Sequence, residues 1–418
     1  MTEAKPYAIP KQLVWDAYKK VKANRGAAGV DGQSLADFEK DLKNNLYKLW
    51  NRMSSGSYFP PPVRLVEIPK GTSGQTRPLG IPTVSDRIAQ MVVKLMLEPQ
   101  VEPHFHEDSY GYRPGKSALD AVGVTRQRCW RRDWVIDLDI KGFFDNLRWD
   151  LVMRALEHHT DVPWILLYVE RWLRAPVRHE DGRLEERTKG SPQGSVISPL
   201  LSNLFMHYAF DQWLRRNHPS VQFARYADDA VVHARSEQEA ETLLAGLRER
   251  LAECGLELHP EKTKIVYCKD DDRRGTYEQT SFDFLGYTFR PRRAKNRHGK
   301  LFVSFLPGVS PKAAKSIRAT IRSWRLGATR NNQRLEDLAK FVNPFVRGWV
   351  NYYGRFYQSA LTPVLRELER SLVYWVRRKF KRLRDHQRRA VHWLGQVARR
   401  EPNLFVLWSH GIRPATGQ

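Results

Sequence analysis

Two acidic segments of the sequence contain residues that could do chemistry. The first is the run from Asp137 through Asp139 to Asp145, DLDIKGFFD, which follows an apolar stretch. The second is Tyr226-Ala-Asp228-Asp229, between the apolar runs FARYA and AVVHA. Carboxylates at the ends of neighbouring strands repel one another and raise each other's pKa. A divalent cation removes that cost, and hard oxygen ligands suit magnesium.

Phosphoryl transfer is the chemistry that such a site would support. Two metal ions can clamp the attacking and the leaving oxygen of the transferred phosphoryl group. Two ordinary acidic turns are the alternative, because adjacent aspartates are common in turns. The tetrapeptide YADD is weak evidence for catalysis on its own.

Strands and helices alternate around these segments. The run WVIDLDI (134–140) predicts a strand, and the runs on either side of Asp228 and Asp229 predict a hairpin with the aspartates at its turn. A second hairpin is predicted over 63–82. Helical periodicity recurs in two helices over 11–56, in one that begins at Ser85, and over about 149–175, 199–216 and 236–254. Together these elements predict an α+β body that ends near residue 290.

Composition and length exclude several classes of protein. The chain has 418 residues, of which 41% are apolar, so wholesale disorder is excluded. No run approaches the roughly 18 apolar residues of a membrane span, and the N-terminus lacks the apolar core of a signal peptide. The three cysteines are far apart and form no CxxC pair, which fits a reducing interior.

The positive charge is concentrated at one end of the chain. The net charge is +24, and residues 290–418 hold 29 basic and 6 acidic side chains. The preceding 289 residues are nearly balanced, with 41 basic and 40 acidic side chains. Basic residues also serve solubility, but an excess this one-sided favours a polyanion, and nucleic acid is the obvious candidate.

The chain beyond residue 300 is expected to be helical. Ser310 and Pro311 form one start signal, and Thr362-Pro363 forms another before a long helix. Six cations of that helix fall within about 60° of one another at 100° per residue. They are Arg366, Arg370, Arg377, Lys381, Arg384 and Arg388. A solvated face is the alternative, but like charges with few acidic partners favour binding of a polyanion.

The motifs as an ordered set resemble one family. They run IPK…RPLGIP, SYGYRPGKSA, DLDIKGFFD, GSPQGSVISPLLSN, RYADD, HPEKTK and FLGY. This order resembles the reverse transcriptases encoded by group II introns, also called maturases, over about residues 15–400. The resemblance implies an α+β right-hand polymerase, with fingers and an antiparallel palm sheet at 58–290. An N-terminal helical extension (1–57) would precede it, and an α-helical thumb or maturase domain X (291–418) would follow it.

The resemblance also implies which residues act. Asp139 and Asp228 look like the two main metal ligands, with Asp229 as the third carboxylate. Asp137 shares a strand face with Asp139 and is the runner-up, whereas Asp145 looks structural. Two Mg²⁺ ions and a dNTP substrate are implied. The 3′-hydroxyl of a primer would attack the α-phosphate of the dNTP, with pyrophosphate leaving.

Further roles follow from the same motifs. Lys70 and Arg77 look like triphosphate contacts. Phe144 stands where the family has an aromatic gate against a 2′-hydroxyl, although a core Phe is the alternative. Gln193 looks like a polar contact to the nucleotide, and Arg113 like a contact to the template.

Four more features are given weaker roles. Gly194 would let the backbone approach the templating pair, and Lys262 could be a general acid, although an exposed lysine is the alternative. The run FLGY (284–287) resembles the primer-grip turn. In FVRGWVNYYGRF (345–356) the rings are expected to form a helix core and the arginines to face RNA. Those rings are Phe345, Trp349, Tyr352 and Phe356.

The implied partners are the group II intron RNA in a ribonucleoprotein, an RNA template, and a DNA primer or target. No membrane partner is expected, the oligomeric state stays open, and the implied location is the cytoplasm of a bacterium, at the nucleoid during work on DNA. The paired cysteines of an HNH endonuclease are not found, so the second DNA strand should be left uncut and priming should come from elsewhere.

Two other functions stay open: a maturase whose polymerase has decayed, and a host-domesticated reverse transcriptase in DNA repair or phage defence.

Overall fold

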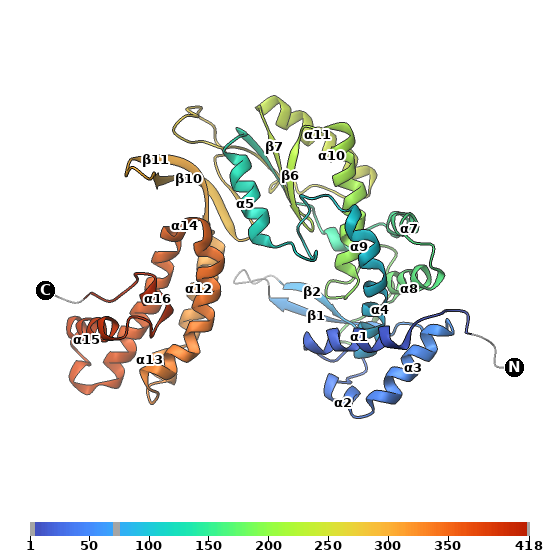
Figure 1. Cartoon of the computed structure of the whole chain (residues 1–418), viewed down its shortest axis with the longest axis horizontal. Coiled ribbons are helices and arrows are strands. Elements are labelled where there is room, and N and C mark those ends of the chain that lie inside the picture. Colours follow the sequence, from blue (N-terminus) through green and yellow to red (C-terminus); the bar gives the residue numbers. More distant parts are fainter. Residues whose placement is uncertain (1–4, 70–75, 416–418) are drawn as a thin grey trace. The chain divides into compact units, whose positions relative to one another are not determined.

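A four-stranded sheet contains the strands that flank both acidic segments. The computed structural model describes residues 5–69 and 76–415. The strand order is β6 (Gln222–Tyr226), β7 (Asp229–Ala234), β3 (Trp134–Leu138) and β8 (Lys264–Tyr267). Strands β6 and β7 form an antiparallel hairpin in which Tyr226 is opposite Asp229 (Figure 1). This confirms the predicted strand and hairpin, and it puts β3 directly beside β7.

The predicted hairpin over 63–82 is present in a second sheet. Strands β1 (Val63–Pro69) and β2 (Thr76–Ile81) are antiparallel, with Arg64 opposite Ile81. Strand β4 (Val177–Arg178) pairs with β1 in parallel, and β5 (Leu184–Glu185) completes the order β2-β1-β4-β5.

A third sheet corrects the expectation that the chain beyond residue 300 is helical. Its order is β11 (Leu301–Val309), β10 (Tyr287–Lys295) and β9 (Phe282–Phe284). Strands β10 and β11 pair along their whole length, so the helices begin only after Val309. The FLGY segment is a two-residue hairpin turn, in which Leu285 and Gly286 both have positive φ, 50° and 81°. Such turns match the right-handed twist of the strands they join.

Helices make up most of the remaining structure. The helices before β6 are α1 (Lys11–Ala23), α2 (Leu35–Glu39), α3 (Leu42–Ser54), α4 (Val84–Val101), η1 (Glu102–His104), α5 (Ala118–Cys129), α6 (Phe143–Asn146), α7 (Trp149–Glu157), α8 (Pro163–Arg174), α9 (Ser198–Met206), the π-helix η2 (His207–Asp211) and α10 (Gln212–Asn217). Those after β7 are α11 (Glu237–Glu253), α12 (Pro311–Ser323), α13 (Leu326–Thr329), α14 (Leu335–Lys379), η3 (Lys381–Leu383), α15 (Gln387–Arg400) and α16 (Val406–Ser409). None of the helices in these described ranges combines the length and hydrophobicity needed to cross a bilayer.

The first residues of α12 and α4 can be compared with the helix starts that the sequence predicts. Ser310 caps α12 as predicted, because its side chain accepts a hydrogen bond from the backbone N–H of Ala313. Helix α4, in contrast, begins at Val84, one residue before the predicted Ser85, and it is capped by Thr83, whose hydroxyl accepts from the N–H of Asp86. Ser85 lies inside the first turn, where its own backbone is already helical.

The chain divides into two compact units. One contains residues 1–121 and 135–265, and the other contains 122–134 and 266–418. This differs from the predicted boundaries at residues 57 and 290. Helix α1 packs against α4, so the N-terminal helices share the core of the first unit. Residue 290 lies inside β10, whose pairing with β9 and β11 ties that region to the second unit.

The second unit is largely helical, around the long helix α14. The helix runs from Leu335 to Lys379 with one non-helical residue, Tyr357 (φ −150°, ψ 79°). Its buried face includes Leu338, Val342, Leu368 and Leu372. The start predicted at Thr362-Pro363 is therefore wrong, because the interruption comes five residues earlier and Pro363 lies within the helix that follows it.

Candidate active site

Both acidic segments reach the same edge of the β6-β7-β3-β8 sheet. Asp139 follows the last residue of β3, and Asp228 lies in the turn between β6 and β7. Burial raises the pKa of Asp228 above its ordinary value, and the nearby charge of Asp139 raises it further. The two carboxylates therefore lie close enough to repel, although about ninety residues separate them in the sequence. Asp229 opens β7 directly after Asp228.

The segment after α11 runs along Asp139. The backbone N–H of His259 donates to the Asp139 carbonyl at 2.8 Å, and Ile140 forms a β-bridge with Leu258. This places the Lys262 ammonium 3.6 Å from Oδ2 of Asp139. Both side chains are partly exposed, so the contact is a weak, solvent-screened ion pair. Lys262 is thus at the site, as a charge partner of Asp139.

The oxygen donors at this edge suit a hard divalent cation. Two partly buried carboxylates that repel one another would both be stabilised by it. Among residues 5–69 and 76–415, however, no three His, Cys, Asp or Glu side chains are gathered closely enough to hold an ion alone. Magnesium is commonly held by one or two carboxylates plus the phosphates of a substrate, so this donor set fits a cation that arrives with a nucleotide.

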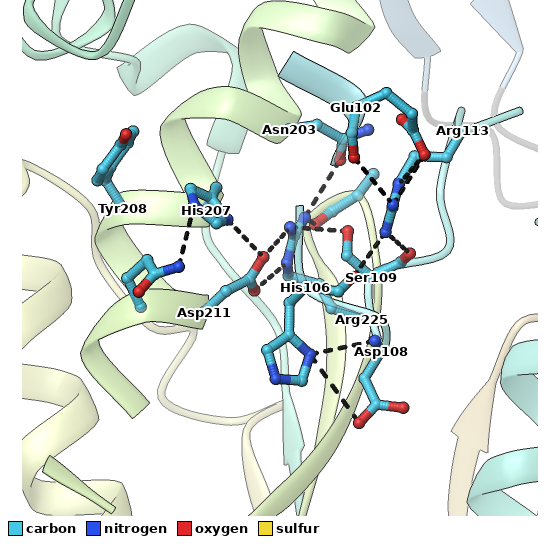
Figure 2. Close-up of polar contacts among 12 residues, drawn as sticks. Glu102, His106, Asp108, Ser109, Arg113, Asn203, His207, Tyr208, Asp211 and Arg225 are labelled. Atoms are coloured by element: carbon cyan, nitrogen blue, oxygen red, sulfur yellow. Dashed lines mark hydrogen bonds and ion pairs between the residues drawn. The ribbon is translucent and has the colours of Figure 1, made fainter. Parts of the chain in front are cut away.

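A buried arginine fixes the aspartate turn, and the sequence motifs did not predict its role. Arg225 is fully buried in β6, and its guanidinium donates five hydrogen bonds (Figure 2). Two go to the Asp211 carboxylate, at 2.7 and 2.6 Å. The others go to the Asn203 side chain (3.2 Å), the Ser109 hydroxyl (2.9 Å) and the Ala227 carbonyl (2.9 Å). The last bond holds the turn itself.

These partners bring four segments of the chain together, three of which are sequence motifs. Asp211 ends the π-helix η2 and Asn203 belongs to the SPLLSN helix α9, while Ser109 opens the SYGYRP segment. Removal of one partner of a buried ion pair costs about 3–5 kcal/mol. The sequence did contain a signal for this role of Arg225. It is a charged residue in the middle of the apolar strand run FARYA, and a charge at such a buried position is tolerated only when it is paired.

The GYRPG loop lies against the same turn. A Cβ on Gly111 would be 2.4 Å from the backbone nitrogen of Ala227, so only glycine fits there. The next residue, Tyr112, is 53% exposed. Burial raises the pKa of its phenol, the neighbouring Tyr226 and Asp228 add to the rise, and Arg77 opposes it. Arg77 of β2 therefore lies near the surface that carries Asp228.

Arg113 is engaged inside the chain, whereas the sequence predicted a contact to the template. Its side chain is 6% exposed and pairs with Glu102 at 2.8 Å. Its guanidinium also donates to the carbonyls of His106 (2.6 Å) and Ser109 (2.7 Å). With these donors engaged inside the chain, Arg113 shapes the loop, and the expected contact to a template is not supported.

The SPQG loop joins segments that the sequence predicts to contact the nucleotide. The Gln193 carbonyl accepts from the N–H of Gly80 in β2 at 2.6 Å, and a Cβ on Gly194 would be 2.6 Å from the Gly80 carbonyl. Gly194 therefore serves a close backbone approach, here to β2. The Phe144 carbonyl accepts from Ser191 of the same loop at 2.7 Å, and its ring is partly buried beside Phe143. Lys70 lies outside the described residues.

The two remaining aspartates of the first motif differ from Asp139. Asp137 is partly buried within β3 itself, and Asp145 is exposed in α6. Neither follows directly from the end of the strand as Asp139 does. Asp139 therefore has the position that best fits the predicted ligand.

The predicted row of cations is interrupted. Helix α14 ends at Lys379, because Phe380 adopts an extended conformation (φ −103°, ψ 110°). Lys381 and Arg384 lie in and beside the short η3, and Arg388 belongs to α15. Arg377 instead donates to the Arg384 carbonyl at 2.9 Å, which closes this turn. Only Arg366, Arg370 and Arg377 share one helix.

The rings of α14 are less buried than expected. Trp349, Tyr352 and Phe356 are partly buried, but Phe345 is 43% exposed. The ring centroid of Trp324 lies 5.2 Å from that of Phe345 and 5.8 Å from that of Trp349, on which it stacks. The expectation of a closed aromatic core therefore holds only in part, and Arg347 and Arg355 are exposed beside these rings.

Comparison with known proteins decides the family. Residues 68–289, just over half of the chain, match the model of the reverse transcriptase (RNA-dependent DNA polymerase) family. The chain belongs to the reverse transcriptase family. Residues 314–393 match the group II intron maturase-specific domain. Both matches confirm the resemblance seen in the sequence, and the first confirms the enzyme class, RNA-directed DNA polymerase.

Individual relatives agree with this family. This reverse transcriptase is 31% identical to protein YkfC of Escherichia coli strain K12, over 74% of this chain and 88% of YkfC. It is 30% identical to the group II intron-encoded protein LtrA of Lactococcus lactis, over 48% of this chain and 33% of LtrA. A putative COX1/OXI3 intron 1 protein of Saccharomyces cerevisiae is 25% identical over 65% of this chain and 37% of its own length. The chain thus spans only about a third of the last two relatives.

One likeness among solved structures is to a telomerase from Candida albicans in complex with telomeric RNA. The TM-score is 0.48 at 12% identity, over 91% of this chain and 68% of that one.

Proposed function

We propose that this reverse transcriptase extends a DNA primer on an RNA template with Asp139, Asp228 and Asp229 at the reaction centre. The observation that carries the proposal is that Asp139, directly after β3, and Asp228, in the β6–β7 turn, come to the same end of the sheet, where the charge of Asp139 helps to raise the pKa of Asp228. Carboxylates are held together against repulsion where a cation is to be bound. In this proposal the β1–β2 hairpin belongs to the fingers, the β6-β7-β3-β8 sheet is the palm, and α12 to α16 form the thumb.

Two Mg²⁺ ions would be held by the oxygens of these three carboxylates together with the phosphates of a dNTP. When bound, they would lower the pKa of the primer hydroxyl and stabilise the charge of the departing pyrophosphate. Asp228 and Asp229 are carried on a turn that Arg225 holds by its bond to the Ala227 carbonyl. That bond keeps the carboxylates in position before the substrate arrives, so little reorganisation is needed.

The nucleotide would lie between β2 and the SPQG loop. Arg77 is exposed on β2 and its charge acts on Tyr112 beside Asp228, so its guanidinium can reach a triphosphate. Lys70 is assigned the same role from the sequence. Gln193 and Phe144 are linked through the loop that contains Ser191, and we assign them to the sugar and base side of the nucleotide. Lys262 would keep Asp139 partly neutralised when no cation is bound.

The second unit would bind the intron RNA that the chain helps to splice. Its charge excess lies in side chains that are exposed, among them Arg366, Arg370 and Arg388. Splicing assistance needs a shaped cationic surface and no carboxylate, so the two activities should be separable. Binding should also weaken steeply with salt, because phosphate contacts release counterions.

Primer extension tests the proposal. A primed RNA template is incubated with dNTPs and Mg²⁺, and Asp228→Ala with Asp229→Ala should abolish extension while intron RNA affinity stays within about twofold. The matched control is Glu180→Ala with Asp181→Ala, an adjacent acidic pair in the exposed turn between β4 and β5, which should extend normally. Extension by the Asp228/Asp229 variant at the wild-type rate would contradict the proposal.

A further inference from the structure

A cavity of about 510 Å³ lies in the first unit. Its lining includes none of Asp139, Asp228 and Asp229. It is formed by α7, by the continuous segment from α9 through η2 to α10, and by α11. Its volume is in the range of cavities that hold small organic ligands. The apolar part of the lining consists of Leu151, Ala155, Phe205, Ala209, Trp213 and Cys254.

A second cavity of about 450 Å³ adjoins the first. The two share His158, Tyr208, Gln212 and Arg216 in their linings, so one molecule could occupy both. The character of the second cavity is different, because it is lined mainly by cationic and imidazole side chains. Besides the shared residues these are His104, His159, His207 and Arg215.

Neither lining contains an aspartate or glutamate. Arg154, Arg215 and Arg216 are exposed and make no ion pair with any carboxylate of residues 5–69 and 76–415. Arg250, in contrast, is engaged with Glu253 and with the carbonyls of Tyr208 and Ala209. Arg154 lines the first cavity, Arg215 lines the second and Arg216 lines both, so the linings carry positive charge that an anion could neutralise.

The wall between the cavities is aromatic and held in place. The Tyr208 hydroxyl and Nε2 of His159 are 2.7 Å apart, and the His158 ring lies 5.9 Å from the Tyr208 ring, edge to face. Tyr208 belongs to the π-helix η2, a rare conformation that is frequent at functional sites. Trp213, one turn onward in α10, leaves part of its indole exposed. These rings offer faces on which a flat heterocycle could stack.

We propose that the two cavities together bind one nucleotide, with its base in the apolar cavity and its phosphate in the cationic cavity. The apolar walls and the rings of Tyr208 and Trp213 fit a heterocycle, and Arg215 and Arg216 fit a phosphate. None of these residues belongs to the proposed polymerase site. The nucleotide is either an unpaired unit of a bound RNA strand or a free nucleotide, and the recognition chemistry is the same.

Photocrosslinking of the full chain tests this site. The probe is a short single-stranded oligoribonucleotide with iodouridine at one position, and crosslinked peptides are identified by mass spectrometry. Crosslinks are expected on Tyr208, Trp213 or His158. If uridine monophosphate at millimolar concentration removes them, the site takes a free nucleotide; if it does not, the site takes a unit of an RNA strand. Both results support the proposal.

Charge reversal gives the second readout. Arg215→Glu with Arg216→Glu should reduce crosslinking at these residues by about tenfold or more, because charge-assisted hydrogen bonds to the phosphate are removed. The matched control is Arg235→Glu with Arg248→Glu, two exposed arginines of the same unit that line neither cavity. Wild-type protein with no crosslink on cavity residues would overturn the proposal. So would equal reductions in the two variants, or removal of the crosslinks by inorganic phosphate at the same millimolar concentration.

Discussion

Arg225 in the first unit and three exposed arginines in the second unit are used in opposite ways. Arg225 in the first unit is fully buried and has a partner for each of its five N–H groups. Arg366, Arg370 and Arg388 in the second unit are exposed, and Arg370 makes one ion pair with Glu367 at 3.4 Å. A buried cation fixes the geometry around it, whereas exposed cations of one sign remain available to an external polyanion.

The largest effect is expected where the buried charge pair is broken. Arg225→Met leaves Asp211 buried without a cation and should lower the free energy of unfolding by about 3–5 kcal/mol. Adding Asp211→Leu should restore much of that stability, because apolar residues replace buried ion pairs well. Primer extension should stay low in the double variant, because the Ala227 carbonyl still lacks its donor. Urea unfolding and extension rates separate the two effects, and recovered extension would show that Arg225 only stabilises the fold.

Asp86 differs from Asp211, the partner of Arg225, because the hydrogen-bond donors to its carboxylate are neutral. Asp86 is buried and accepts hydrogen bonds from Tyr58, Trp172 and Gln90, which are all neutral. Burial raises its pKa to about 6. The folded pKa lies above the unfolded one, so the stability linked to Asp86 is present in acid and is lost as the pH rises through about 6.

Asp86→Asn should remove this dependence. Relative to the wild type, the variant should gain up to about 3 kcal/mol in the free energy of unfolding between about pH 4 and pH 7. Urea unfolding of both proteins across that range is the measurement. A difference that does not change with pH would show that Asp86 has an ordinary pKa.

Two glycines, one in each unit, are expected to respond with opposite signs. Gly111→Ala places a Cβ 2.4 Å from the Ala227 nitrogen and should cost about 1–3 kcal/mol and slow extension. A Cβ on Gly348 in α14 would meet nothing within 4 Å, so Gly348→Ala should stabilise the helix by up to about 1 kcal/mol. Thermal unfolding measures both, and destabilisation by Gly348→Ala would mean that its surroundings are tighter than the structure has them.

The smallest effect on the fold, and a clear one on binding, is expected for the exposed cations. Arg366→Glu with Arg370→Glu should leave unfolding unchanged and weaken RNA binding. The slope of log affinity against log salt should fall by about 0.7–0.9 for each phosphate that the variant no longer neutralises. Arg235→Glu with Arg248→Glu in the first unit is the matched control. Equal slopes for the two variants and the wild type would show that Arg366 and Arg370 are merely solvated.

The sequence predicted the aspartate hairpin well because its signals are local. The apolar runs on both sides of Asp228 and Asp229 are short and contain aromatic or β-branched residues, and the two-residue turn between them joins paired strands. What could not be predicted is the support beneath the turn. Asp211 and Asn203 reach Arg225 only through the π-helix and α9, which lie 14 and 22 residues away in the chain.

The predicted row of cations shows the opposite case, in which a local signal gave a wrong result. Its periodicity assumed a continuous helix through Phe380, but the chain turns there and Arg377 caps the carbonyl of Arg384. A helical wheel takes no account of tertiary packing, so it could not show that break. Arg113 was misplaced for a related reason: its motif suggested a ligand contact, but Glu102 and two carbonyls engage its guanidinium inside the chain.

Cleavage by a bound redox metal tests most directly whether Asp139 and the Asp228-Asp229 pair hold the same cations. Fe²⁺ replaces Mg²⁺ in the presence of primed template and dNTP, and ascorbate with peroxide then generates radicals that cut the backbone near the ion. Cuts are expected beside both Asp139 and Asp228, retained in Glu180→Ala with Asp181→Ala and abolished in Asp228→Ala with Asp229→Ala. Cuts at only one of the two segments, or cuts that persist without the aspartates, would contradict a shared metal site.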